Sequence, residues 1–416
     1  MFTPDVPDPH AQTSTRPRLK AKGTLIELQP HTMLNLSELR AQIDAFEAHH
    51  AETYDRRQRQ CETAVEALHA LSPRWQSVHD AVERAQPRRL VARMQERPDA
   101  THAAPERPPE VTVVATDGSQ IYPDRHIEPT YFLLNISRVA FQYGTTEPPL
   151  LTSTPDLRFR EDLSAHFDAM LGTMTPEMVS ALRDEQELRH LLQTAREARV
   201  SGRPLVALAD GTLIRWMIRG MHNRTVEERL IATYGRLLQG FADDRLPLAS
   251  YISMPGNTEV VHLLQFDRDE LDAPESDDTL TGLLDRTLFD AVLDVGERSA
   301  IFRSPSRIQS AYAAHSQICY TYLKVPAPGG SEIARLEMPA WVANEAALLD
   351  RLHSVILDEC QKGNGYPIAL SEAHEHAVIR GPEREAFVRL MERRLRRSGR
   401  STTGSRKQRS KQLPRV

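Results

Sequence analysis

Cysteine is scarce in this sequence: Cys61, Cys319 and Cys360 are the only three among 416 residues. They lie far apart and lack Cys-x-x-Cys spacing, so the sequence predicts buried free thiols and argues against a disulfide framework or a zinc ribbon. No apolar run approaches the roughly 18 to 20 residues that a membrane-spanning helix needs. The first ten residues also lack the basic and apolar regions of a signal peptide, so we expect a cytoplasmic protein that spans no membrane.

Net charge is also small, but it is distributed unevenly along the chain. The whole sequence carries −5, and residues 393–416 contain ten lysines and arginines without any acidic residue, so the rest carries −15. A basic segment attached to an acidic body is typical of a flexible arm that binds a polyanion, with nucleic acid as the first candidate. A solvated tail without a binding role is the alternative that charge alone leaves open.

Proline content and apolar periodicity divide the chain into five segments. Residues 1–34 are rich in proline and polar residues and are expected to form a disordered arm. Residues 35–97 carry apolar residues at helical spacing, which predicts a helical N-terminal module. Four prolines make residues 98–110 a linker. Residues 111–392 then form the principal domain, and residues 393–416 are the flexible basic tail.

Two short apolar segments in the principal domain each end in an aspartate followed by glycine. Residues 111–116 (VTVVAT) precede Asp117, and residues 204–209 (PLVALA) precede Asp210. Between these two predicted strands, the pattern predicts further strands over 131–143 and 150–159 and a helix over 175–198. This is the order of a ribonuclease H-like core, so we predict an α/β fold with a mixed central sheet.

In that architecture the two aspartates meet at the carboxyl edge of the sheet, where ligands of open α/β sheets bind. Carboxylates that share a cleft repel each other and require a proton or a bound cation between them. Their hard oxygens suit Mg²⁺ or Mn²⁺, and two such ions about 3.5 to 4 Å apart can hold the attacking and leaving oxygens of a phosphodiester. Simple turn formation by Asp-Gly is the alternative explanation.

The predicted helix between these strands offers a third carboxylate, from Asp184, Glu185 or Glu187. Glu185 and Glu187 both border the apolar side of the helix, so periodicity does not choose between them.

A further candidate lies near the C-terminus, where Tyr366 and Pro367 precede a predicted helix that contains His374 and His376. Histidine can act as a metal ligand or a proton shuttle, although a single helical histidine is more often structural. His374 and His376 diverge on a helix, which argues against both binding one metal.

Six segments resemble the NurA family of DNA repair nucleases in order and approximate spacing. They are VVATDGSQI, PLVALADGTLI, YISMPGNTEVV, YTYLKV with ARLEMPAWV, and GYPIALSEAH, and the similarity covers about residues 110–390. The resemblance implies a ribonuclease H-like and Piwi-like nuclease fold, a homodimer, and degradation of DNA with Mn²⁺, with Mg²⁺ as the weaker metal. It also implies work with a hexameric HerA-type translocating ATPase in DNA end resection and double-strand break repair.

The resemblance implies roles for particular residues. The metal ligands that it implies are Asp117, Glu187, Asp210 and His374. Glu187 corresponds to the acid of an Arg-x-x-x-Glu pattern that begins at Arg183. Tyr366 completes the implied catalytic set, and we expect it to position the scissile phosphate or the leaving oxygen.

These implications lead to a functional hypothesis, a two-metal phosphodiester hydrolase that acts as a 5′–3′ exonuclease, a single-strand endonuclease, or both. The weaker candidates for contacts to the DNA backbone are Arg125, His126 and Lys324. The alternative function is a nuclease-like adaptor that regulates a motor ATPase and has little catalysis of its own. The sequence contains no G-x-x-x-x-G-K-[ST] motif, so any motor would be a separate protein.

Overall fold

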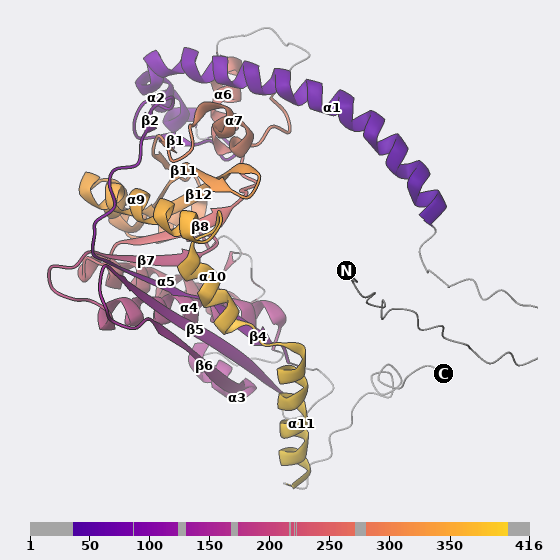
Figure 1. Ribbon diagram of the computed structural model, residues 1–416, viewed down its shortest axis with the longest axis vertical. Helices are drawn as coiled ribbons and strands as arrows, with labels where there is room; N and C mark the ends of the chain where they lie inside the picture. The colour runs from indigo at the N-terminus through magenta and orange to yellow at the C-terminus, as the bar shows by residue number, and fades with distance from the viewer. Residues whose placement is uncertain are drawn as a thin grey trace, which may run out of the picture. The chain divides into compact units, whose positions relative to one another are not determined.

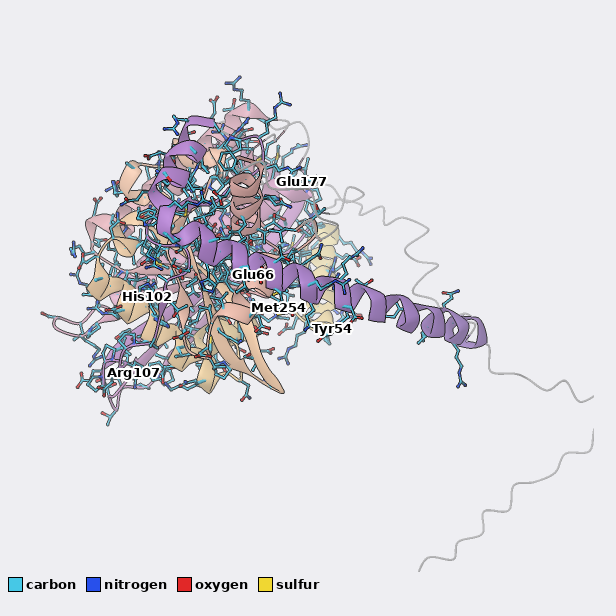
Figure 2. All side chains as sticks on the ribbon, turned by 90° about the horizontal axis from the view of Figure 1, so that it is seen from above. Tyr54, Glu66, His102, Arg107, Glu177 and Met254 are labelled. Carbon is cyan, nitrogen blue, oxygen red and sulfur yellow. The ribbon has the colours of Figure 1, made fainter. Side chains whose placement is uncertain are left out.

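The computed structural model describes residues 36–85, 87–123, 130–167, 174–215, 218–219, 221, 223–270 and 280–397. The chain divides into two compact units, residues 1–55 and 56–416. The described part of the first unit is the beginning of helix α1 (Leu36–Leu71), on which Ile43 and Phe46 are exposed. Tyr54 is also exposed on this helix (Figure 2). The expected arm, residues 1–34, lies outside the described residues, as do Arg125 and His126.

The second unit begins with helices and short strands that pack into its core. These elements are the end of α1, η1 (Ser72–Arg74), α2 (Trp75–Ala85), β1 (Arg93–Met94) and β2 (Thr101–His102). Leu68, Leu71 and Val82 share one buried cluster with α6 (Glu259–Glu270) and α7 (Asp285–Val292). The expected helical N-terminal region is present, and residues on both sides of position 97 contribute to this core.

A mixed sheet of twelve strands organises the second unit (Figure 1). Its first strands are β3 (Val111–Thr116), β4 (Gly118–Ile121), β5 (Tyr131–Tyr143), β6 (Leu150–Phe159), β7 (Leu205–Asp210) and β8 (Leu248–Ser253). The later strands are β9 (Arg298–Ser299), β10 (Phe302–Arg303), β11 (Ile318–Ala327) and β12 (Gly330–Pro339). β3 is antiparallel to β5 and parallel to β7, and β7 is parallel to β8.

The sheet carries an apolar core on each face. The helices of the first part are α3 (Arg160–Phe167), α4 (Pro176–Glu197) and α5 (Arg224–Asp243). Those of the C-terminal part are η3 (Arg307–Ala311), η4 (Ala314–Ser316), α8 (Ala340–Ala343), α9 (Ala346–Lys362), α10 (Ile368–Ala377) and α11 (Gly381–Arg397). Val114 and Ala207 pack with α4 and α5, whereas Val113 and Val206 pack with α9 and α10. Strands covered on both faces need the continuous apolar runs that the sequence contains.

The observed order confirms the predicted α/β fold with a ribonuclease H-like arrangement. An antiparallel group (β3, β5 and β6) is followed by α4 and then by β7, which returns parallel to β3. Helix α4 begins after Thr175, whose side chain accepts a hydrogen bond from Met178 N, as the sequence predicted for a capped helix with proline in its first turn.

Two expectations need correction. The chain does not turn after β3 but continues as β4, because β3 and β4 pair with successive parts of β5. The segment assigned to the flexible tail begins as helix, since α11 extends to Arg397 and Leu395 is buried beside Tyr131 and Met391. Residues 398–416 lie outside the described part of the chain.

The sequence also predicted free thiols and a chain that spans no membrane. All three cysteines are free, with Cys319 and Cys360 buried and Cys61 partly exposed. Across the described residues, no helix combines the length and apolarity required to cross a membrane.

Candidate active site

The pairing of β3 with β7 places two aspartates side by side at the carboxyl ends of these strands. Thr116 pairs with Ala209 in parallel register, so Asp117, directly after β3, and Asp210, the last residue of β7, lie at the same level on neighbouring strands. Adjacent strands are about 4.8 Å apart. Burial of both faces fixes this register, because a slip by one residue would exchange the two cores.

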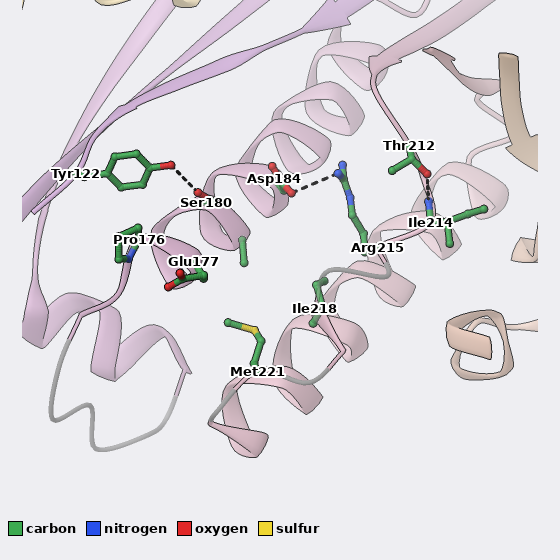
Figure 3. A pocket seen from close by; sticks show the side chains of 11 residues that line it. Tyr122, Pro176, Glu177, Ser180, Asp184, Thr212, Ile214, Arg215, Ile218 and Met221 are labelled. Atoms are coloured by element: carbon green, nitrogen blue, oxygen red, sulfur yellow. Dashed lines mark hydrogen bonds and ion pairs between the residues drawn. The ribbon is translucent and has the colours of Figure 1, made fainter. Parts of the chain in front are cut away.

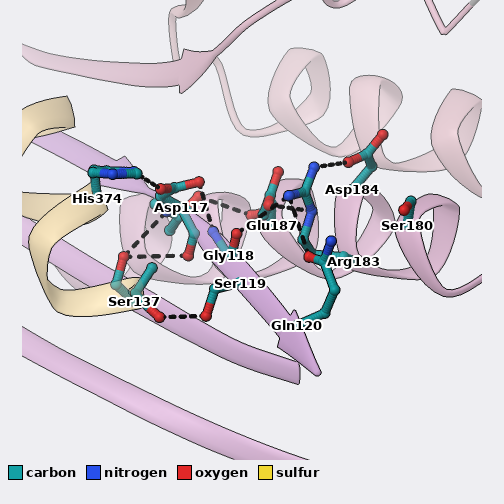
Figure 4. Close-up of polar contacts among 12 residues, drawn as sticks. Asp117, Gly118, Ser119, Gln120, Ser137, Ser180, Arg183, Asp184, Glu187 and His374 are labelled. Carbon is teal, nitrogen blue, oxygen red and sulfur yellow. Dashed lines mark hydrogen bonds and ion pairs between the residues drawn. The ribbon is translucent and has the colours of Figure 1, made fainter. Parts of the chain in front are cut away.

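Asp117 is held between β4 and helix α10 (Figure 4). Its Oδ2 lies 2.9 Å from His374 Nδ1, and its Oδ1 accepts a hydrogen bond of 2.7 Å from Gly118 N. The Asp117 side chain is 16% exposed and that of His374 is 64% exposed. A substrate can therefore reach the imidazole from solvent while the carboxylate stays fixed.

Two polar residues within the apolar strand β5 position α10. Ser137 Oγ donates to Ala373 O at 2.6 Å, and Asn135 Nδ2 donates to Ala377 O at 2.9 Å. These contacts hold the helix segment that carries His374. Neither Asn135 nor Ser137 belongs to a recognisable sequence motif, and the signal in the sequence is that each is a polar residue within an apolar strand.

Asp210 is paired with a tyrosine from the turn before α10. Tyr366 Oη donates to Asp210 Oδ1 at 2.8 Å. Its ring packs edge to face on Tyr251 at 5.3 Å, and Tyr251 Oη donates to Gly365 O at 3.1 Å. Burial raises the pKa of Tyr366, and the charge of Asp210 raises it further. The hydroxyl therefore keeps its proton and remains a hydrogen-bond donor.

The structure distinguishes the two acids on α4 that periodicity left open. Glu187 lies on the side of Asp117, whose charge contributes to its raised pKa, and Thr116 Oγ1 donates to the backbone oxygen of Glu187 at 3.0 Å. Glu185 is committed elsewhere, with Oε2 3.0 Å from His166 Nε2 and Oε1 2.7 Å from Arg189. Of these two acids, Glu187 is the one that the fold brings toward the strand-end carboxylates.

Arg183 links Glu187 to the third acid of the helix. Its Nε lies 3.1 Å from Glu187 Oε1, and its Nη2 lies 2.9 Å from Asp184 Oδ1 (Figure 4). Burial raises the pKa of Glu187 to about 8, with Arg183 opposing the shift and Asp184 and Asp117 adding to it. Several carboxylates thus compete for limited positive charge in this region.

The two Asp-Gly pairs use glycine for different reasons. Gly211 has a φ of 71°, in the left-handed region that favours glycine, so Asp210 is followed by a true turn. At Gly118 the requirement is close approach, because an added Cβ would lie 2.6 Å from Glu187 Oε1 and 2.9 Å from Arg183 Cγ. The turn interpretation therefore applies to Asp210 and not to Asp117.

The side chains of the site are of the kinds that bind a divalent cation, but each candidate ligand is in contact with a neighbouring polar side chain. Among the described residues, no three His, Cys, Asp or Glu side chains are arranged to hold a metal ion. Glu187 Oε1 is buried and accepts no hydrogen bond from the described part of the chain, although it is ion-paired with Arg183. A buried acceptor near Asp117 is suited to a cation, and carboxylates with one imidazole are ligands that Mn²⁺ accepts.

Lys324, the remaining candidate for a DNA contact, is engaged within the protein. Its Nζ donates to Asp290 O at 2.6 Å and lies 3.1 Å from Asp290 Oδ1. This pairing of β11 with α7 gives Lys324 a structural role.

Several known proteins are similar to this chain in sequence or in structure. The NurA domain matches residues 111–379. Similar solved structures include the NurA nuclease from Sulfolobus solfataricus, with 12% identity over 72% of this chain and 88% of that chain and a TM-score of 0.45. Endonuclease V from Ciona intestinalis, in complex with inosine-containing DNA, has 11% identity over 68% and 87% of the two chains and a TM-score of 0.25. No curated protein matches the sequence.

Proposed function

This chain belongs to the NurA family of nucleases, and we propose that it is a metal-dependent DNA nuclease of the two-metal type. The observation that carries the proposal is the parallel register of β3 and β7, which brings Asp117 and Asp210 to one sheet edge. Glu187 from α4 and His374 from α10 lie beside Asp117. The same edge thus carries acidic oxygens, an imidazole and the hydroxyl of Tyr366.

Asp117, Glu187, Asp210 and His374 are the proposed metal ligands. Carboxylate oxygens suit both Mg²⁺ and Mn²⁺, and an imidazole ligand favours Mn²⁺. Bound cations of this kind supply Lewis-acid stabilisation of charge on the attacking and leaving oxygens of a phosphodiester. The ion pair with Arg183 engages Glu187 through Oε1, and the contact with Asp117 engages His374 through Nδ1, so the second oxygen of Glu187 and the Nε2 of His374 are the proposed ligand atoms.

Tyr366 is the proposed positioning group for the phosphate. Its hydroxyl is held by Asp210 and its ring by Tyr251, and its raised pKa keeps the proton in place. The hydroxyl has one proton, which Asp210 now accepts, so the proposed contact to a phosphate oxygen or the leaving oxygen requires this proton to turn from Asp210 to the substrate. Orientation of the reacting phosphate is a large part of catalysis in phosphoryl transfer.

Membership in the NurA family also supports a more specific proposal about cleavage mode, assembly and biological role. We infer a 5′–3′ exonuclease or single-strand endonuclease, active as a cytoplasmic homodimer in DNA end resection and double-strand break repair. The sequence has no P-loop motif, so strand separation is assigned to a separate hexameric HerA-type ATPase. The basic residues of 393–416 are proposed to help retain DNA through phosphate contacts.

The central test is cleavage of end-labelled single- and double-stranded DNA by the full chain with Mn²⁺, with Mg²⁺ or with a chelator. We expect Mn²⁺-dependent cutting that exceeds cutting with Mg²⁺. Asp117→Ala and Asp210→Ala should each reduce cutting by more than about 100-fold, beyond the 10- to 100-fold loss typical of residues that only hydrogen-bond the metal ligands. Asp243→Ala, at an exposed position on α5, is the matched control and should retain wild-type activity.

Three outcomes would contradict parts of this proposal. Retained cutting by Asp117→Ala would remove that residue from the site, and undiminished cutting in chelator would remove the metal. A wild-type chain that never cuts DNA but changes the rate of an added HerA-type ATPase would support the adaptor function instead.

A further inference from the structure

A pocket of about 360 Å³ lies between α4 and the segment that follows β7 (Figure 3). Two of its lining residues connect it to the proposed metal ligands. Asp184 is ion-paired with Arg183, whose other partner is Glu187, and Thr212 follows Asp210 by two residues. A group bound in the pocket would therefore lie near the candidate active site.

The lining of the pocket is mainly apolar and includes one aromatic ring. Tyr122 and Pro176 lie on one side, and Ile214, Ile218 and Met221 complete the apolar surface (Figure 3). The volume falls within the roughly 300 to 1,000 Å³ of small-molecule sites. A flat ring system that stacks on Tyr122 and contacts aliphatic side chains fits this surface.

The charges around the pocket disfavour a phosphate and favour a neutral group. Glu177 and Asp184 line the pocket, with Arg215 as the basic residue among its lining. Arg215 Nη1 lies 3.3 Å from Asp184 Oδ2, so its charge is already paired. The Ser180 hydroxyl, 2.8 Å from Tyr122 Oη, adds a neutral donor and acceptor at the rim of the apolar surface.

We propose that this pocket binds one unpaired nucleobase of the strand that is cut, beside the scissile phosphate. The proposal rests on the proposed nuclease function and specifies its substrate as a strand with at least one base free of pairing. A nucleobase is neutral and flat and has polar edges, and its stacking on an aromatic side chain strengthens binding of a single strand. In a duplex that base would first have to leave the stack, at the cost of its stacking and pairing.

The test compares binding of two short single-stranded oligodeoxynucleotides in chelator, where no cutting occurs. One has all its bases, and the other has a single abasic residue that is moved stepwise along the strand. At one position we expect wild type to bind the complete strand about tenfold more tightly, within the range that stacking allows. Tyr122→Ala should bring this ratio close to one, whereas Tyr122→Phe keeps the ring and should preserve it. Tyr122 is 41% exposed, so its truncation leaves the core intact.

A second variant fills the pocket from the helix side. Ala181 lines the pocket on α4, and Ala181→Phe should also bring the ratio close to one. Ala347→Phe introduces the same ring at an exposed position on α9 and should leave the ratio unchanged. Thermal unfolding of each variant verifies that it is folded.

The outcomes separate this inference from the nuclease proposal. If wild type cuts DNA with metal but binds complete and abasic strands equally at every position, the base pocket is wrong and the nuclease stands. If the ratio is present and depends on Tyr122 while no metal supports cutting, the pocket stands and the nuclease proposal fails. A ratio that persists in both Tyr122→Ala and Ala181→Phe places the base elsewhere and overturns the inference.

Discussion

His353 is a buried base whose protonation opposes folding. Its side chain is 1% exposed, and its Nε2 lies 2.8 Å from Gly296 O. Burial lowers its pKa from the ordinary 6.5 to about 4. The unfolded chain therefore takes up a proton at a higher pH than the folded chain does, so this group's contribution to stability is present above pH 6.5 and is lost as the pH falls toward 4.

At the residue scale we predict a pH-dependent stability that His353→Gln removes. Between pH 7 and pH 5 wild type should lose about 2 kcal/mol of unfolding free energy more than the variant, since one pKa unit corresponds to about 1.4 kcal/mol. Urea unfolding at both pH values measures this difference. His315→Gln changes an exposed histidine and should keep the wild-type slope. Equal slopes in wild type and His353→Gln would show that His353 titrates normally.

At the element scale, α4 packs against β4 only because Gly118 has no side chain. A Cβ there would approach Glu187 Oε1, Ile136 Cδ1 and Arg183 Cγ at 2.6, 2.8 and 2.9 Å. The two charged side chains can move, but only by leaving the positions that the site requires. The spacing between helix and strand therefore determines where the helix carboxylate lies.

Gly118→Ala should accordingly damage both stability and activity. We expect a loss of about 1 to 3 kcal/mol from overpacking, measured by urea unfolding, and at least a tenfold loss of nuclease activity as Glu187 is displaced. Gly235→Ala is the control, because Gly235 lies inside α5 and a Cβ added there would meet open space. It should gain about 0.5 to 1 kcal/mol and keep its activity. Wild-type activity in Gly118→Ala would contradict the close-approach argument.

At the scale of the whole second unit, a buried ionic network connects α6 to the active-site edge. Arg335 on β12 is fully buried, with its guanidinium 2.7 Å from Glu259 and 2.9 Å from Glu337. Glu337 Oε2 then accepts a hydrogen bond of 2.9 Å from Leu213 N, in the segment after Asp210. The turn that follows Asp210 is thus anchored to strand β12.

Removing the positive charge of Arg335 from the centre of this network should strongly destabilise the second unit. Arg335→Met leaves two buried carboxylates without their partner, which costs about 3 to 5 kcal/mol. Urea unfolding measures the loss. Arg389→Met removes an exposed pair with Glu385 on α11 and should cost less than about 1 kcal/mol. A loss of that small size in Arg335→Met would mean that the network contributes little to folding.

Much of the fold was predictable from local pattern. The apolar runs before Asp117 and Asp210 predicted two buried strands, and Thr175 with Pro176 predicted the start of α4. The ordering of these elements indicated the mixed sheet. The continuation of β3 into β4 was not predictable, because it depends on pairing with a distant strand, and Asp-Gly is equally compatible with a turn.

The sequence by itself determined which residue types stand at strand ends, because burial of a strand between two layers requires an unbroken apolar run. Only the tertiary structure decided that Glu187 and not Glu185 approaches Asp117, because helical periodicity defines a face but not the partner that the face meets. It also decided the base-sized pocket, whose walls come from residues separated along the chain. Distances between such residues are set by packing of whole elements, which no local pattern contains.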